Sequence, residues 1–161
     1  MNQKHPYSGL PDYQFWLNDP AIDDPICFDP VTSVSFSIAR SDRVVTAGSC
    51  FAQHVARHLF RMNYNVLVTE TAHDLVPPEL ARRYNYGVFS ARYGNIYTPL
   101  QLKQLIERAY GEFSPLEYCW AGPGGSFVDP FRPRIQPGGF ISEAELVSDQ
   151  FVHLRAVRAV S

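Results

Sequence analysis

Apolar residues gather in two short runs at the start of the main part of the chain, at residues 43–47 and 66–68. Runs of this length are typical of buried strands. Between them, apolar residues recur at helical spacing, which predicts a helix over about residues 50–62. The order strand, helix, strand is that of a βαβ unit, and it predicts a parallel strand pair with a right-handed crossover.

Two later helices are marked by their ends. Thr98 followed by Pro99 is typical of a helix start, and Gly111 is typical of a helix end. Ser142 and Glu145 form a capping box that predicts the start of the last helix. The apolar stripe of that last helix is Val147, Phe151, Leu154 and Val157. Because a third strand is missing, Val147, Phe151 and Leu154 are expected to be exposed or to be buried against residues 1–41.

Proline and aromatic residues divide the rest of the chain. Residues 1–41 carry prolines at short intervals, which exclude long helices and predict an arm lying on the surface of a domain over residues 42–161. Residues 114–140 are irregular, with a hairpin expected around 121–126. A long irregular stretch in a compact domain usually serves or covers a site.

The candidate chemistry lies at Gly48, Ser49 and Cys50, where the first strand meets its helix. A nucleophile at this place would have free backbone N–H groups and the helix dipole beside it. The alternative is structural, with Ser49 as an N-cap and Cys50 as a small buried residue. The thiol of Cys50 is a third candidate, because a helix N-terminus lowers a thiol pKa.

The pentapeptide Gly-Ser-Cys-Phe-Ala at residues 48–52 resembles the signature of the GSCFA family. Residues 89–98 and 127–134 also resemble that family, as do His5-Pro6-Tyr7 and Phe15-Trp16, so the resemblance covers essentially the whole chain. The family is similar to the SGNH (GDSL-like) hydrolases. The resemblance therefore implies a three-layer α/β/α, flavodoxin-like fold with a parallel sheet.

The same resemblance implies roles for three residues. Ser49 matches the SGNH nucleophile, whose own N–H serves the oxyanion hole, and Gly94 with Asn95 resembles the block that gives further oxyanion donors. Gly48 stands where GDSL enzymes have an aspartate. The later blocks, a Gly-x-Asn-Asp segment and an Asp-x-x-His pair, are missing from the sequence.

A serine nucleophile needs a base at neutral pH. His54 and His58 share a helix face without the glutamate of a zinc protease motif, so a solvated or partner-facing pair is the favoured interpretation. His73 follows the second strand and is the first candidate for a substitute base, whereas His153 on the last helix is expected at a surface or interface. An anionic or sugar-binding rim of Arg92, Tyr93, Arg132 and Arg134 competes with the interpretation, favoured here, that the arginines pack on aromatic rings and bind loop carbonyls.

Composition narrows the function. The 161 residues are 45% apolar and 19% charged with a net charge of −2, typical of a globular protein and not of a nucleic-acid or membrane binder. Three scattered cysteines and a polar N-terminus predict reduced thiols and a cytoplasmic location. No metal or organic cofactor is expected.

Two strands are too few for a doubly wound sheet, so residues 42–161 are interpreted as the N-terminal part of a longer domain. The expected activity is ester hydrolysis or O-acyl (acetyl) transfer by Ser49, on a small-molecule or saccharide ester. The alternative is a non-catalytic remnant that binds a partner or a carbohydrate. Self-association or a missing C-terminal segment would complete the domain.

Overall fold

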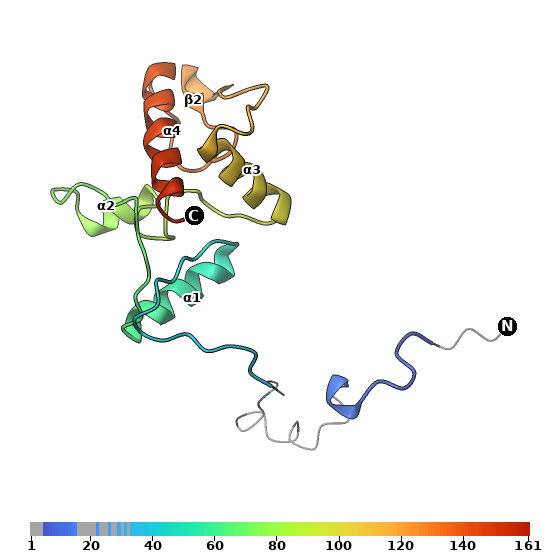
Figure 1. Cartoon of the computed structure of the whole chain (residues 1–161). Coiled ribbons are helices and arrows are strands. Elements are labelled where there is room, and N and C mark those ends of the chain that lie inside the picture. Colours follow the sequence, from blue (N-terminus) through green and yellow to red (C-terminus); the bar gives the residue numbers. More distant parts are fainter. Residues whose placement is uncertain (1–4, 16–21, 23–25, 27–28, 30, 32) are drawn as a thin grey trace. The chain divides into compact units, whose positions relative to one another are not determined.

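The computed structural model describes residues 5–15, 22, 26, 29, 31 and 33–161 (Figure 1). The chain divides into two compact units, Met1–Ile38 and Ala39–Ser161. In the first unit the described residues include the short 3₁₀ turn η1, Asp12–Gln14. Trp16 and Cys27 lie outside the described residues, and the placement of an arm over residues 1–41 stays a prediction.

The second unit is mainly helical. Its helices and strands are α1 (Cys50–Arg61), α2 (Pro78–Arg83), α3 (Pro99–Tyr110), β1 (Trp120–Ala121), β2 (Phe127–Val128) and α4 (Glu143–Arg158). The hairpin predicted around 121–126 is confirmed, since β1 and β2 pair in antiparallel fashion across the turn η4 (Pro123–Gly125).

The helix ends follow the local sequence signals. The Thr98 side chain accepts a hydrogen bond from Gln101 N at 3.1 Å, and Ser142 accepts from Glu145 N at the same distance. Gly111 ends α3 in the left-handed conformation with φ of 78°, which favours glycine because it has no Cβ. These caps satisfy N–H and C=O groups that the helices leave unpaired.

The expected three-layer α/β/α fold with a parallel sheet is wrong. In the described residues the sheet is the two-stranded antiparallel β1–β2 pair, and the predicted parallel pair is reduced to one isolated bridge between Val44 and Val66. The ladder stops because Ser90 lies where it would continue. Ser90 Oγ accepts from Thr46 N at 2.9 Å, and Ser90 O accepts from Thr69 N at 2.8 Å.

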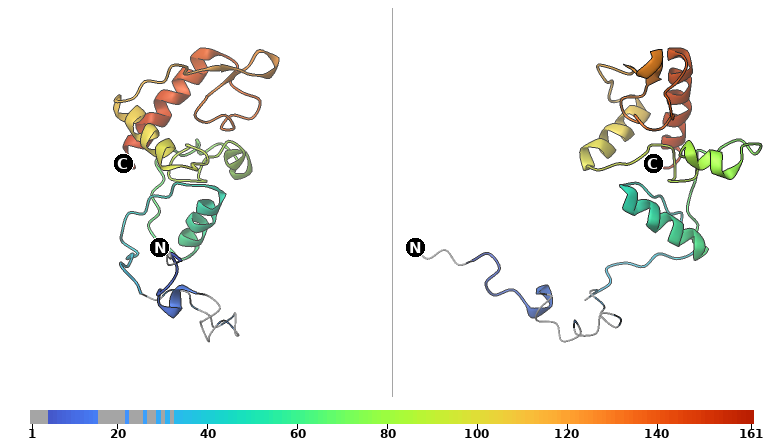
Figure 2. Two further views of the ribbon diagram at one scale, coloured as in Figure 1. Left: turned by 90° about the vertical axis from the view of Figure 1, so that its right-hand side faces the viewer. Right: turned by 180° about the vertical axis from the view of Figure 1, so that it is seen from behind.

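The main core lies between α3, α4 and the segment that precedes α3. Figure 2 shows α3 and α4 side by side in both views, and the two helices are in contact. The buried apolar residues of this core are Phe89, Ala91, Tyr93, Ile96, Leu105, Ala109, Ala156 and Val157. A smaller core under the hairpin consists of Ile135, Phe140 and Leu146. Segment 89–96 is therefore held in place from several sides.

The apolar stripe predicted for α4 is largely exposed, as expected for a helix that does not pack on a complete sheet. Val147 and Phe151 are exposed and Leu154 is half-buried, and only Val157 of that set is fully buried. The buried face instead carries Leu146, Gln150, His153, Ala156 and Val157. Two polar side chains on that face have partners inside the molecule: Gln150 donates to Tyr118 O, and His153 bonds to Glu70.

Candidate functional site

The Ser49 turn and the Gly94 loop lie against each other. Ile96 N donates to Gly48 O at 2.9 Å, which joins the two backbones directly. One helical turn after Ser49, Gln53 Nε2 donates to Asn95 Oδ1 at 3.1 Å. These two bonds, one on each side of the turn, bring together the segments that hold the three predicted site residues, although their catalytic roles stay predictions.

Ser49 is half-buried and caps α1, with its Oγ accepting a hydrogen bond from Phe51 N at 3.3 Å. The predicted structural role of Ser49 is therefore present. Within the described residues the backbone N–H groups of Ser49 and Gly94 donate to no protein acceptor. Two free donors on adjoining turns are what an oxyanion-binding site needs.

Glycine is required at both turns for different reasons. A Cβ on Gly48 would lie 2.9 Å from the Cβ of Ala52 on the first turn of α1, so the turn and the helix could not pack this closely. Gly94 has φ of +69° with open space where a Cβ would be. Its requirement is thus conformational and not steric.

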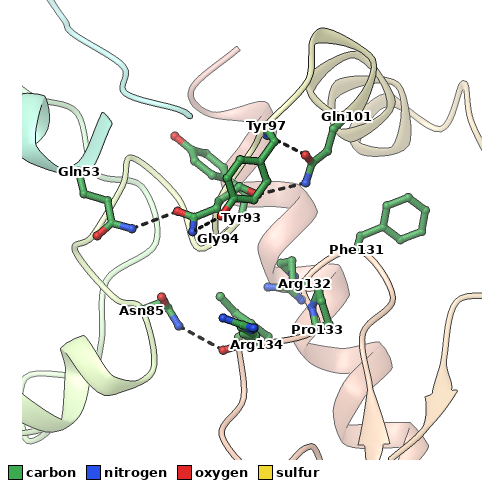
Figure 3. A pocket seen from close by; sticks show the side chains of 12 residues that line it. Gln53, Asn85, Tyr93, Gly94, Tyr97, Gln101, Phe131, Arg132, Pro133 and Arg134 are labelled. Atoms are coloured by element: carbon green, nitrogen blue, oxygen red, sulfur yellow. Dashed lines mark hydrogen bonds between the residues drawn. The ribbon is translucent and has the colours of Figure 1, made fainter. Parts of the chain in front are cut away.

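A cavity of about 430 Å³ opens beside the Gly94 turn (Figure 3). Its lining comes from α1, from the segment before α3, from the first turn of α3 and from the loop after β2. The lining residues are Gln53, Asn85, Tyr93, Gly94, Asn95, Tyr97, Gln101, Phe131, Arg132, Pro133, Arg134 and Ile135. Ser49 is not part of the lining, and it lies one helical turn from Gln53 on the same side of α1.

Hydrogen bonds fix one wall of this cavity. Asn95 Nδ2 donates to the Tyr97 hydroxyl at 3.0 Å, and Tyr97 N donates to Gln101 Oε1 at 2.9 Å. Gln101 Nε2 in turn donates to Asn95 O at 3.1 Å. Because Asn95 is bonded through both its side chain and its carbonyl, the loop that carries Gly94 is held in one conformation.

The histidines predicted as base candidates do not reach Ser49. His54 and His58 are exposed on α1, as the solvated interpretation predicts, and His54 Nδ1 lies 3.1 Å from Arg57 Nη2. His73 is exposed, with its Nδ1 accepting from Leu75 N. In the part of the chain that the structure describes, no histidine or carboxylate bonds to Ser49 Oγ, and no group of three or more acidic, histidine or cysteine residues is placed to hold a metal.

The sequence interpretation missed a buried acid–histidine pair. His153 Nδ1 lies 2.8 Å from Glu70 Oε2, and both side chains are almost fully buried. Burial lowers the pKa of His153, although its bond to Glu70 opposes that effect. Burial raises the pKa of Glu70, but the hydrogen bonds from His153 and from Arg92 N outweigh it and the net pKa is lowered. The pair is therefore a neutral imidazole donating to a carboxylate.

Two buried arginines share one carboxylate. Arg92 Nη1 and Arg132 Nη2 bind the two oxygens of Asp149 at 2.7 and 2.6 Å, and Arg132 also binds Asp129 at 2.8 Å. Burial raises the pKa of Asp149, but the two guanidinium groups lower it by more, so the net pKa is lowered. Asp149 thereby ties α4 to both loops of the cavity.

The predicted packing of the arginines on rings and carbonyls is confirmed for Arg92. Its guanidinium lies 4.1 Å from the centre of the Tyr86 ring, and its Nε donates to Tyr84 O at 2.9 Å. Arg92 does not line the cavity, whereas Tyr93, Arg132 and Arg134 do. The rim proposed from the sequence is thus formed in part.

The interpretation of Cys50 as a small buried residue is wrong. Cys50 is the first residue of α1 and its side chain is exposed with a free thiol. The residues facing the core from α1 are Ala52 and Ala56. The thiol therefore stays in contact with solvent beside Ser49.

One family model matches the segment that carries the predicted site residues. Residues 43–120 match the model of the GSCFA family, and this segment contains Ser49, Gly94 and Asn95. For these residues the match confirms the family predicted from the sequence. The family-like motifs at the N-terminus and at 127–134 lie outside the matched segment. No curated protein and no solved structure matches the chain.

The lengths and hydropathy of the helices show whether any of them could cross a membrane. Among the helices of the described residues, none combines the length and the apolar character that crossing a bilayer requires. The cytoplasmic location, the partners and the absence of nucleic-acid binding stay predictions from the sequence.

Proposed function

We propose that this chain supplies a Ser49-dependent acyl-ester site, which hydrolyses an ester or transfers an acyl group, such as acetyl, to or from a hydroxyl. The observation that supports the proposal most is the 2.9 Å bond from Ile96 N to Gly48 O. That bond joins the segment that carries Gly94 to the Ser49 turn, and the backbone N–H groups of Ser49 and Gly94 have no acceptor among the described residues. The match of residues 43–120 to the GSCFA family, which resembles the SGNH hydrolases, supports the same chemistry.

In this proposal Ser49 Oγ attacks the acyl carbonyl and its proton passes to a base. The N–H groups of Ser49 and Gly94 stabilise the negative charge that develops on the carbonyl oxygen, and the second N–H of the Asn95 amide assists them. The bond between the carbonyl carbon and the leaving oxygen then breaks, which leaves an acyl group on Ser49. Water or an acceptor hydroxyl removes that group.

The base is the missing component, because no described histidine or carboxylate bonds to Ser49 Oγ. We therefore expect slow hydrolysis of p-nitrophenyl acetate by the chain alone, and only a slight effect of Ser49→Ala. Donor groups and binding sustain a residual rate in serine hydrolases that have lost a triad member.

Added imidazole tests the proposal, since it can replace the missing base. We expect the hydrolysis rate to rise with imidazole concentration more in the wild-type chain than in Ser49→Ala. Cys50→Ser should behave as wild type, because Cys50 has no place in the scheme. A rescue that is lost in Cys50→Ser and kept in Ser49→Ala would assign the chemistry to the thiol.

The lack of a base bonded to Ser49 Oγ among the described residues also supports the alternative, in which the chain has no catalytic activity. If imidazole gives no excess rate over Ser49→Ala, the chain is better described as a binding domain. A fast reaction without imidazole that Ser49→Ala abolishes would instead show that a local histidine serves as base.

A further inference from the structure

The cavity beside the Gly94 turn carries an uncompensated positive charge. Its lining includes two arginines and no carboxylate. The charge of Arg132 is matched by Asp129 and Asp149. Arg134 is exposed, and within the described residues its guanidinium forms no hydrogen bond or ion pair. Of the two guanidinium groups, that of Arg134 is thus the one free to bind a ligand.

The backbone of Arg134 is bonded to the segment that follows α2. Asn85 Nδ2 donates a long hydrogen bond of 3.5 Å to Arg134 O, as Figure 3 shows. Arg134 also follows Pro133, whose ring fixes one backbone angle. These restraints act on the backbone of Arg134 and leave the five donor hydrogens of its guanidinium available.

The same cavity offers unused hydrogen-bonding atoms for hydroxyl groups. The side-chain amide nitrogens of Gln53 and Asn85 each donate within the protein. Their side-chain amide oxygens have no partner among the described residues. The Tyr97 hydroxyl accepts from Asn95 and keeps its own hydrogen to donate. Two acceptors and one donor fit a ligand that carries several hydroxyl groups.

Aromatic rings supply the apolar part of the lining. Phe131 is half-buried, with the Arg108 guanidinium 3.9 Å from its ring centre, and Tyr97 is largely exposed. A cavity of about 430 Å³ lies within the usual range for small-molecule sites. It therefore combines ring surfaces, hydroxyl partners and one free cation.

We propose that this cavity binds an acidic sugar, a pyranose ring that carries a carboxylate. Arg134 binds the carboxylate of the sugar. The side-chain amide oxygens of Gln53 and Asn85 accept hydrogen bonds from its hydroxyl groups. Tyr97 and Phe131 contact the apolar edge of the pyranose ring. As a substrate assignment this rests on the proposed function, because Ser49 acts on the ester that such a sugar carries. The binding itself does not depend on Ser49.

Titration calorimetry with the whole chain tests the proposal, using methyl glucuronide, methyl glucoside and sodium acetate as probes. We expect the glucuronide to bind at least tenfold more tightly than either other probe, and added salt to weaken it. Arg134→Gln should remove this preference, and Arg134→Lys should retain part of it. Arg82→Gln is the matched control, since Arg82 is exposed on α2 and outside the cavity.

Equal binding of glucuronide and glucoside would overturn the proposal, as would a preference that survives Arg134→Gln in a variant with the wild-type circular dichroism spectrum. Acetate that binds as tightly as glucuronide would show a site for anions and not for sugars. Glucuronide binding without imidazole-dependent Ser49 chemistry would contradict the proposed function alone. Ser49 chemistry without the glucuronide preference would contradict this inference alone.

Discussion

Ser90 Oγ accepts a hydrogen bond from Thr46 N at 2.9 Å across 44 residues of sequence. Both residues are buried, and the Tyr93 hydroxyl donates to Thr46 O from the same segment. The N–H and the C=O of Thr46 are therefore taken by side chains where a parallel neighbour would otherwise bind them. This pairing ends the Val44–Val66 ladder after one bridge and places the Gly94 loop beside Ser49.

Ser90→Ala should lower the free energy of unfolding by about 1–3 kcal/mol, because it leaves the buried N–H of Thr46 without an acceptor. Urea denaturation measures the difference. Ser126→Ala is the control, since its hydroxyl bonds locally to Pro123 O and is not buried. A loss in Ser90→Ala no larger than in the control would mean that the Ser90–Thr46 bond does not organise this segment.

Asp149→Asn should cost about 3 kcal/mol or more, because it leaves Arg92 and Arg132 buried with part of their charge unpaired. Lys103→Gln breaks an ion pair of similar length, 2.6 Å to Glu107, on the exposed face of α3. We expect that change to cost less than about 0.5 kcal/mol. Similar losses in the two variants, measured by urea denaturation, would contradict the role given to burial.

Stability should fall as the pH is lowered below about 6.5, the usual pKa of an unfolded histidine. The pKa of His153 is lowered in the folded chain, so the unfolded chain binds the proton first and gains stability from it. The lowered pKa of Glu70 adds a further loss at pH values below about 4.5. Both effects therefore favour the folded chain at neutral pH.

His153→Gln tests the source of that pH dependence. It should flatten the stability profile between pH 7 and 5, as followed by denaturation at several pH values. The exposed His73 offers the matched control, and His73→Gln should keep the wild-type slope. An unchanged slope in His153→Gln would place the titrating group elsewhere.

Gly94→Ala should lower stability by about 1–2 kcal/mol through its positive φ alone, since nothing lies within 4 Å of the added Cβ. Gly111→Ala has the same open space and a similar φ of +78° at the end of α3, far along the chain from Ser49. We expect equal stability losses in the two variants, but loss of imidazole-rescued hydrolysis only in Gly94→Ala. Equal rescue of hydrolysis by imidazole in both variants would show that Gly94 has no role in the site.

Signals that act over a few residues made the helix ends predictable. Thr98, Gly111 and Ser142 cap their helices as the sequence indicates, because the bonds of a cap join residues two or three positions apart. The parallel sheet was not predictable in this way. Whether the two strands pair beyond one bridge depends on Ser90. This residue lies 44 positions from Thr46, so no local sequence pattern joins the two.

The buried pair of Glu70 and His153 is separated by 83 residues, so no motif joins them. The sequence did contain a signal for the burial of His153. Leu146, Gln150, His153 and Val157 follow helical spacing, and the structure shows this stripe as the buried face of α4. Val147 and Phe151 lie on the exposed face of α4, as expected, whereas the prediction that His153 lies at a surface or interface is wrong, because its imidazole is buried with a polar partner.

The central claim is that Ser49 accepts an acyl group, and locating the acetyl adduct tests it most directly. The chain is treated with p-nitrophenyl acetate and imidazole, quenched in acid and digested, and the modified peptide is sequenced by mass spectrometry. Ser142→Ala is the control for Ser49→Ala, because each removes the N-cap of a helix at a cost of about 1 kcal/mol. The account predicts acetyl on Ser49 in the wild type and in Ser142→Ala; acetyl on Cys50 or on surface lysine with none on Ser49 would contradict it.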